Sequence, residues 1–192
     1  MHLVKCEVVP QSLVADMHIA FNAEVDQASY NILLLGPGTA QEADLPADIN
    51  LNVVAFAEVG KRYTHCKRRF PNAKSFYGLE ALCCLLREGR VTLPRIDAIV
   101  STLPCQDVTR LKQLNGYPTT PTASLFTSLQ FEVAKLTSAS HVVNEMVIPT
   151  AENMHNHQCV ADGYAKIGYG SRCCLADAGL CGDGSSHVRW FM

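Results

Sequence analysis

The chain alternates short, continuous apolar runs with stretches of helical periodicity. Residues 31–35 are apolar after the first position and lead into Gly36-Pro37-Gly38, which predicts a buried strand entering a tight turn. Three further runs predict strands at residues 51–58, 96–100 and 141–148. Strands that are apolar throughout are typical of a parallel sheet covered on both faces.

Three segments between these runs favour helices. Residues 61–69 are basic and predict a helix, and residues 75–89 have apolar positions at helical spacing up to a terminating Gly89. Residues 122–136 predict a third helix. Its expected buried face consists of Leu125, Leu129, Val133 and Leu136. Residues 171–192 hold two short runs around a Gly/Ser-rich turn, which predicts a closing hairpin.

Strands that alternate with helices indicate an α/β doubly wound domain with a mostly parallel sheet and a closing antiparallel hairpin. A length of 192 residues suits a single domain over residues 1–192. In such a fold, ligands bind at the carboxyl ends of the strands. We therefore expect the functional residues in four places: residues 36–39, Glu58, residues 103–106 and Glu145.

Composition narrows the class of protein. Hydrophobic residues make up 48% and charged residues 18%, with a net charge of −2, which excludes a disordered chain or a strongly cationic tail. No apolar run approaches the roughly 18 residues of a membrane span, and no signal peptide is evident, so we expect a cytoplasmic protein of bacterial or phage origin without a membrane partner. One basic set is either a solvated helix face or a DNA contact. It consists of Lys61, Arg62, Lys67, Arg68, Arg69 and Lys74.

Nine cysteines do not form the pattern of a disulfide framework, because the number is odd and two pairs, Cys83-Cys84 and Cys173-Cys174, are adjacent. We expect reduced thiols that mostly act as small buried hydrophobic residues. Metal-capable residues cluster in the last third of the chain, but without paired Cys-x-x-Cys units, and we predict no metal site. They are His155, His157, Cys159, Cys173, Cys174 and Cys181.

The first two predicted strands carry a layout that is common for nucleoside-containing cofactors. A glycine-containing turn follows the first strand, and Glu58 ends the second. Glycines let the backbone approach a ligand closely, and a carboxylate accepts hydrogen bonds from ribose hydroxyls. The same Gly-Pro-Gly sequence also makes an ordinary turn, and that interpretation stays open.

Three short motifs follow in a fixed order. Pro104-Cys105-Gln106 comes after the third predicted strand, Asn144-Glu145-Met146-Val147 lies within the fourth, and His187-Val188-Arg189 precedes the C-terminus. A Ser-Leu-Phe segment at 124–126 lies between the first two. This set resembles the DNA (cytosine-5)-methyltransferases, whose Pro-Cys-Gln, Glu-Asn-Val and Arg-x-Arg motifs occur in this order at similar intervals.

The resemblance covers residues 30–192. Residues 5–22 resemble the segment normally found at the family's C-terminal end, which would make the chain circularly permuted. The family implies a Rossmann-like methyltransferase fold, S-adenosylmethionine as cofactor and double-stranded DNA as partner. By resemblance, the cofactor contacts are Gly36, Pro37, Gly38, Thr39, Glu58, Val59, Glu80, Pro104 and Leu125.

The family also implies a mechanism, methyl transfer to carbon 5 of a cytosine flipped out of the DNA stack. Cys105, between Pro104 and Gln106, adds to carbon 6, Glu145 donates to ring nitrogen N3, and Arg189 holds the O2 oxygen. From the residues alone, a structural role for Cys105 and an ion pair of Arg189 with Asp177 or Asp183 stay open.

The chain departs from the family in several places. Met146 replaces an asparagine, His187 an arginine, and Leu79 the aspartate that receives the adenine amino group, with Glu80 next to it. No target-recognition region follows Arg189, so we expect a catalytic domain that is truncated or is completed by a second subunit. The alternatives are a degenerate methyltransferase-like module that only binds or assembles, and an RNA cytosine methyltransferase.

Overall fold

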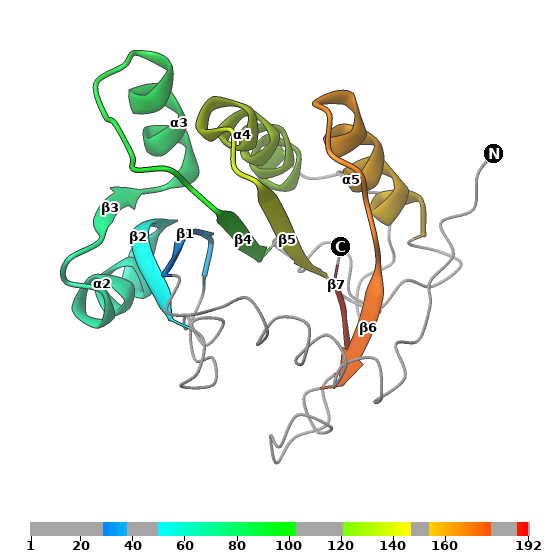
Figure 1. The fold of residues 1–192 in the computed structure, drawn as a ribbon, viewed down its shortest axis with the longest axis horizontal. Coiled ribbons are helices and arrows are strands. Elements are labelled where there is room, and N and C mark those ends of the chain that lie inside the picture. The colour runs from blue at the N-terminus through cyan, green and yellow to red at the C-terminus, as the bar shows by residue number, and fades with distance from the viewer. Residues whose placement is uncertain (1–28, 38–49, 103–120, 147–153, 178–187, 192) are drawn as a thin grey trace.

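In a computed structural model, residues 29–37, 50–102, 121–146, 154–177 and 188–191 are described. Within these residues, seven strands form one sheet in the order β3-β2-β1-β4-β5-β7-β6 (Figure 1). The strands are β1 (Tyr30–Leu35), β2 (Leu51–Glu58), β3 (Lys74–Tyr77), β4 (Ala98–Thr102), β5 (His141–Met146), β6 (Cys174–Asp177) and β7 (Val188–Phe191).

The sheet is parallel except at one edge. β1 pairs in parallel with both β2 and β4, and the parallel pairing continues to β3 on one side and β5 on the other. β7 runs antiparallel to β5 and β6. The predicted parallel sheet with a closing antiparallel hairpin is therefore confirmed. The strand order turns at β1 and β4, the point where ligands bind in doubly wound folds.

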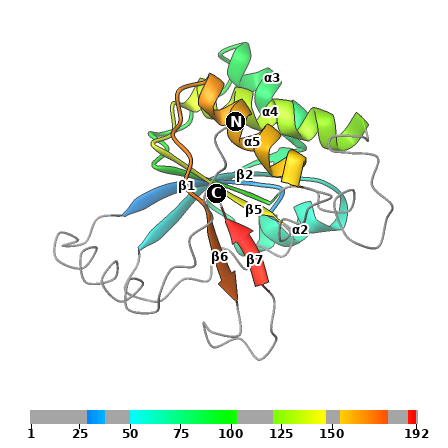
Figure 2. The ribbon, with the colours of Figure 1, turned by 90° about the vertical axis from the view of Figure 1, so that its right-hand side faces the viewer.

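Helices cover both faces of this sheet. α3 (Leu79–Arg87), α4 (Pro121–Thr137) and α5 (Met154–Lys166) lie on one face, and α2 (Gly60–Arg69) lies on the other (Figure 2). Leu33 and Leu35 of β1 lie in the core between the sheet and helices α3, α4 and α5. Ile32 and Leu34 lie in the core between the sheet and α2. A strand segment that is buried on both faces is typically apolar throughout, as residues 32–35 of β1 are.

Two predicted elements are wrong in their boundaries. The helix expected over 75–89 begins only at Leu79, because Lys74–Tyr77 pair with β2 as strand β3. Phe76 is buried and Tyr77 is exposed, the alternation of a strand, and Gly78 at φ +91° separates strand from helix. The strand expected at 96–100 is β4, which begins two residues later, at Ala98.

The expected buried face of α4 is confirmed at Val133, which is buried, and at Leu129, which packs against the core, but it is wrong at its two ends. Leu125 and Leu136 are 42% and 41% exposed, whereas Thr127 and Gln130 are buried. The buried stripe runs through these two polar residues to Val133 and Ala134. Sequence periodicity missed this face because it counts only apolar residues, and here a glutamine occupies a core position.

Where α4 meets α5, a glycine makes room for an aromatic ring. A Cβ added to Gly163 would overlap the ring of Phe131, far inside van der Waals contact. The Phe131 ring in turn packs edge-on against Tyr164, with 4.7 Å between the ring centroids. The close approach of the two helices therefore depends on the missing side chain at position 163.

We expect Gly163→Ala to lower the free energy of unfolding by about 1–3 kcal/mol through overpacking, although alanine favours a helix more than glycine does. Urea denaturation measures the change. Gly170→Ala is the matched control, since a Cβ there meets nothing within 4 Å, and its stability should be unchanged or slightly higher. Equal effects of the two substitutions would contradict the close packing.

Candidate functional site

The ends of four parallel strands form one row at the carboxyl edge of the sheet (Figure 1). Glu58 at the end of β2 pairs with Tyr77, and Thr102 at the end of β4 pairs with Glu145. Leu35, the last residue of β1, pairs with Ala57 on one side and Ser101 on the other. Gly36, Glu58, Thr102 and Glu145, which are far apart in the sequence, are thus neighbours along this edge.

Gly36 is the junction between the two halves of this row. Its backbone has φ +63°, and an added Cβ would lie 3.2 Å from both Cζ of Phe126 and the carbonyl oxygen of Thr102. Its N–H donates to the Ala57 carbonyl over 2.9 Å. Both the left-handed conformation and the close neighbours require glycine here.

Pro37 follows and is buried, and the rest of the predicted loop, Gly38 and Thr39, lies outside the described residues. The described part of the turn thus brings the backbone at the end of β1 close to β4 and α4.

Glu58 is buried, with 6% of its surface exposed. Its Oε1 accepts a hydrogen bond from the Val59 N–H over 2.8 Å, and its carbonyl accepts one from the Gly78 N–H over 3.0 Å. The carboxylate is therefore held against the start of α2. A carboxylate fixed at the carboxyl edge is suited to accept hydroxyl donors from a ligand.

Two exposed side chains flank Glu58. Val59 is 53% exposed and Tyr77 is 63% exposed. The Tyr77 hydroxyl accepts a hydrogen bond from the Gly60 N–H, and its ring lies edge-on to Tyr63 with 5.3 Å between centroids. Two exposed apolar side chains therefore neighbour Glu58, one next to it in the chain and one in its register-paired position on β3. Tyr77 was missed by sequence reasoning because residues 75–89 were expected to be one helix.

The first turn of α3 carries two adjacent residues that differ in burial. Leu79 is buried in the core, and Glu80 is exposed in the same turn. Leu79, which stands where the resembled family has an aspartate, is therefore a packing residue. Glu80 and the exposed Leu125 of α4 are the accessible members of the predicted cofactor set on these two helices.

The other end of the row carries Glu145, which is partly buried on β5. The next residue, Met146, is buried in the core. Glu145 pairs with Phe191 of β7, and Arg189 lies two positions further along β7 in the direction of the carboxyl edge. The hairpin thus brings the backbone of residue 189 next to the end of β5.

The predicted nucleophile loop lies outside the described residues. Pro104, Cys105 and Gln106 follow β4, whose last residue, Thr102, is in the row described above. The chain therefore leaves β4 at the carboxyl edge, three residues before Cys105.

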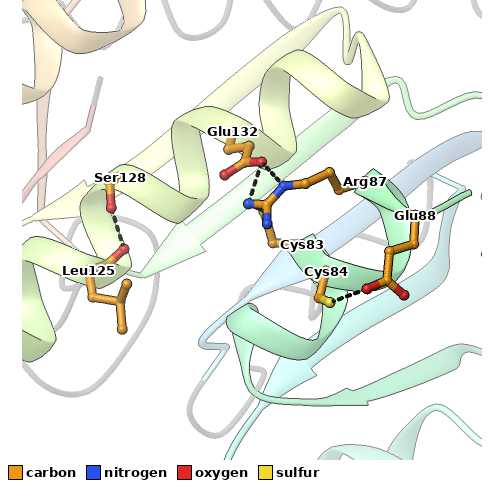
Figure 3. Close-up of polar contacts among 7 residues, drawn as sticks. All are labelled: Cys83, Cys84, Arg87, Glu88, Leu125, Ser128 and Glu132. Atoms are coloured by element: carbon orange, nitrogen blue, oxygen red, sulfur yellow. Dashed lines mark hydrogen bonds and ion pairs between the residues drawn. The ribbon is translucent and has the colours of Figure 1, made fainter.

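Described cysteines next to this edge are not activated thiols. Burial, together with the carboxylate of Glu132, raises the pKa of Cys83 to about 11. The Cys84 thiol donates to Glu88 Oε1 over 3.1 Å, and this hydrogen bond raises the Cys84 pKa (Figure 3). A raised pKa keeps a thiol protonated and weakly nucleophilic. Cys83 is buried in the core, as we expect for most cysteines of this chain, whereas Cys84 is exposed.

Arg87 joins the two helices that support this region. Its guanidinium lies 2.7 Å from Glu132 Oε1, which links the end of α3 to α4 (Figure 3). The pair lowers the pKa of Glu132, chiefly through the hydrogen bond from Arg87. The contact is largely exposed, so it adds little to stability beyond orienting the helices.

The described part of the last third of the chain contains no group of three or more residues placed to hold a metal ion. His157 points from α5 into the protein, in one stripe with Val160, Ala161 and Tyr164. Burial lowers its pKa to about 4, so the imidazole is neutral at physiological pH. It is a core histidine.

α2 carries the predicted basic set on its surface. Lys61, Arg62, Lys67 and Arg68 are exposed, and the helix contains no acidic residue in its first turn. Lys74 lies on β3 and donates to the Thr92 carbonyl over 2.6 Å. The helix begins directly after Glu58, so its basic surface starts at the edge that carries the candidate site. No described helix is both long and apolar enough to cross a membrane.

Comparison with solved structures identifies the fold. A protein assigned as a DNA modification methyltransferase encoded within an E. coli prophage matches with a TM-score of 0.60 and 13% identity over 84% of this chain. The chain has a DNA (cytosine-5)-methyltransferase-like fold. A mutant of Spodoptera frugiperda DNMT2 (TM-score 0.54, 16% identity) and the S. pombe Dnmt2 methyltransferase (0.50, 13%) match over the same 84%.

The matched region is less than half of each of these proteins. The chain covers 45%, 48% and 47% of the three methyltransferase structures in turn. No family model matches the chain, and no curated protein is similar to it in sequence. The common methyltransferase fold is therefore carried by strand order and packing, with few identical residues.

The junction at Gly36 is open to test. We expect Gly36→Ala to lower the free energy of unfolding by about 1–3 kcal/mol more than Gly89→Ala. Both glycines have left-handed φ, +63° and +65°, but a Cβ at position 89 meets nothing within 4 Å. The difference between the two, measured by urea denaturation, isolates the contact with Phe126 and Thr102 from backbone strain. Equal losses would show that the contact is unimportant.

Proposed function

We propose that this chain is the catalytic domain of an S-adenosylmethionine-dependent DNA (cytosine-5)-methyltransferase. The observation that supports it most is the row at the carboxyl edge. There, a sheet with the methyltransferase strand order aligns Gly36 and Glu58 with Thr102 and Glu145. The first pair suits a cofactor site and the second pair suits a reaction site, and β1 and β4 are adjacent.

The cofactor half fits S-adenosylmethionine through its own residues. The turn at Gly36 and Pro37, continuing into Gly38 and Thr39, lets the backbone approach the ligand, and Glu58 accepts hydrogen bonds from the ribose hydroxyls. When bound, S-adenosylmethionine supplies an electrophilic methyl group. Apolar contact with the adenine ring comes from Val59, and three further residues complete the set. They are Glu80, Pro104 and Leu125.

The reaction half acts on cytosine. Cys105, as a thiolate, adds to carbon 6, and the electron pair released from the double bond makes carbon 5 nucleophilic. Glu145 donates a proton to N3 and Arg189 donates hydrogen bonds to O2, which stabilises the added charge. After methylation, loss of the carbon 5 proton expels the Cys105 thiolate. Pro104 and Gln106 shape the loop that carries the nucleophile.

Double-stranded DNA is the proposed partner. The exposed basic residues of α2 are available for phosphate contacts on a chain that is otherwise acidic. The comparisons give no support for a separate recognition subunit. Because the chain covers only 45% of the prophage methyltransferase, activity of the chain by itself is part of what we propose.

One observation favours a second candidate function. Leu79 is buried in the core, so it offers no polar group to an adenine amino group, and Met146 is buried as well. A relative that keeps the fold but has lost methyl transfer would show such replacements. This candidate is a degenerate module that binds the cofactor or assembles with a partner.

The cofactor proposal is tested with Glu58→Gln. We expect S-adenosylmethionine to bind about tenfold to a hundredfold more weakly, because a charged hydrogen-bond acceptor is lost. Isothermal titration calorimetry measures the affinity. Glu88→Gln is the charge-matched control. Glu88 is the C-cap residue of α3, and its substitution should leave the affinity unchanged. Equal affinities of Glu58→Gln and the unaltered chain would contradict a role in ribose binding.

The reaction is tested by covalent trapping. Duplex DNA that contains 5-fluorocytosine should form a stable adduct with the chain and S-adenosylmethionine, since fluorine cannot leave carbon 5 as a proton does. Cys105→Ser should abolish the adduct, and Cys84→Ser should retain it, because the Cys84 thiol is held protonated beside Glu88. The readout is a shifted band on a denaturing gel.

Cofactor binding without any adduct would favour the degenerate module. Competitor nucleic acid without fluorine distinguishes the substrates. If ordinary RNA abolishes the adduct and ordinary DNA does not, the reaction is assigned to RNA.

A further inference from the structure

A buried polar group lies beneath the row of strand ends. The Ser101 hydroxyl of β4 donates to Oε1 of Gln130 on α4 over 2.8 Å, and both residues are 0% exposed. Burial of two polar side chains is unfavourable unless their hydrogen bonds are made. This pair joins β4 to the helix that covers it.

A third buried polar side chain, the amide of Asn144, lies beside the pair of Ser101 and Gln130. Asn144 of β5 is 1% exposed and pairs in register with Ser101. Among the described residues, Nδ2 and Oδ1 of Asn144 have no hydrogen-bond partner, and neither has Nε2 of Gln130. An unused amide donor and an unused amide acceptor thus both border the same serine.

Ser101 and Asn144 each come one residue before the strand-end pair of the candidate reaction site. Ser101 precedes Thr102, and Asn144 precedes Glu145, and Thr102 and Glu145 are themselves paired. One turn before Gln130 on α4, Phe126 packs against Gly36. α4 therefore contacts the cofactor half through Phe126 and the reaction half through Gln130.

We infer that Gln130 is a positioning residue for the reaction half of the site, an inference that rests on the proposed function. Its amide bridges Ser101 and Asn144, accepting from the first through Oε1 and donating to Oδ1 of the second through Nε2. The Asn144 amide reaches this arrangement by rotating about its last side-chain torsion, which has broad minima.

The bridge fixes the stagger of β4 against β5 at the point where each strand ends. Cys105 follows the end of β4 by three residues, and Glu145 is on β5. Attack on carbon 6 and donation to N3 act on the same ring, so the two groups must be held at a fixed separation. A displacement of about 1 Å can lower a rate about a hundredfold.

The test compares Gln130→Met, which keeps the volume and removes the amide, with the unaltered chain. We expect adduct formation with 5-fluorocytosine duplex to slow by about tenfold to a hundredfold. The affinity for S-adenosylmethionine should change less than about threefold, because Gly36 and Glu58 lie on other strands. General loss of stability would instead lower both quantities together.

Asn144→Leu, and the double variant that combines it with Gln130→Met, test whether the two residues act through one bridge. Asn144→Leu should slow adduct formation to a similar degree, and the double variant should be no slower than either single one, since all three lose the same bridge. Thr137→Val is the matched control on α4. It removes a hydroxyl that donates to the Val133 carbonyl at the far end of the helix, and it should react at the normal rate.

Failure of this inference and failure of the proposed function are distinguishable. If the unaltered chain reacts and Gln130→Met reacts equally fast, the positioning role is overturned and the methyltransferase proposal stands. If the unaltered chain does not react, the proposed function fails, and amide hydrogen exchange at 100–102 and 143–146 decides the bridge. Faster exchange in Gln130→Met but not in Thr137→Val supports it, and unchanged exchange overturns it.

Discussion

The close approach at Gly36 is the constraint on which the arrangement of the site depends. There the end of β1, the carbonyl of Thr102 at the end of β4 and the ring of Phe126 on α4 meet within van der Waals contact. An added methyl group here would press on both neighbours, and the left-handed backbone strains any other side chain, so glycine suits the position where the ends of β1 and β4 lie together.

Helix α4 connects that constraint to the rest of the domain. Its buried stripe is unusual because Gln130 and Thr127 replace apolar residues, and Gln130 makes its bond to Ser101 instead of filling volume. On its outer side the helix holds Glu132, which pairs with Arg87 and raises the pKa of Cys83. The same helix therefore contacts the end of β4 on one side and α3 on the other, where burial first and Glu132 second raise the pKa of Cys83.

The comparison with solved methyltransferases has a physical lesson as well. At 13–16% identity, the likeness lies in the fold, which depends on backbone geometry and packing more than on particular side chains. Leu79 and Met146 are core residues of this fold and offer no polar group to a ligand. Fold and chemistry can therefore separate, and the site residues need their own tests.

The sequence by itself determined the strands that are apolar on both faces. β2 was predicted from Leu51 to Glu58 without error, and the parallel sheet and closing hairpin followed from the alternation of elements. It also placed Gly36 and Glu58 at strand ends, because the apolar runs stop there, and it placed Glu145 on the fourth strand. Only the tertiary structure decided that Lys74–Tyr77 form an edge strand, that α4 buries Gln130 instead of Leu125, and that Thr102 of β4 pairs with Glu145 of the neighbouring strand β5. These depend on pairing and packing between residues distant in the chain, which no local pattern of hydrophobicity encodes.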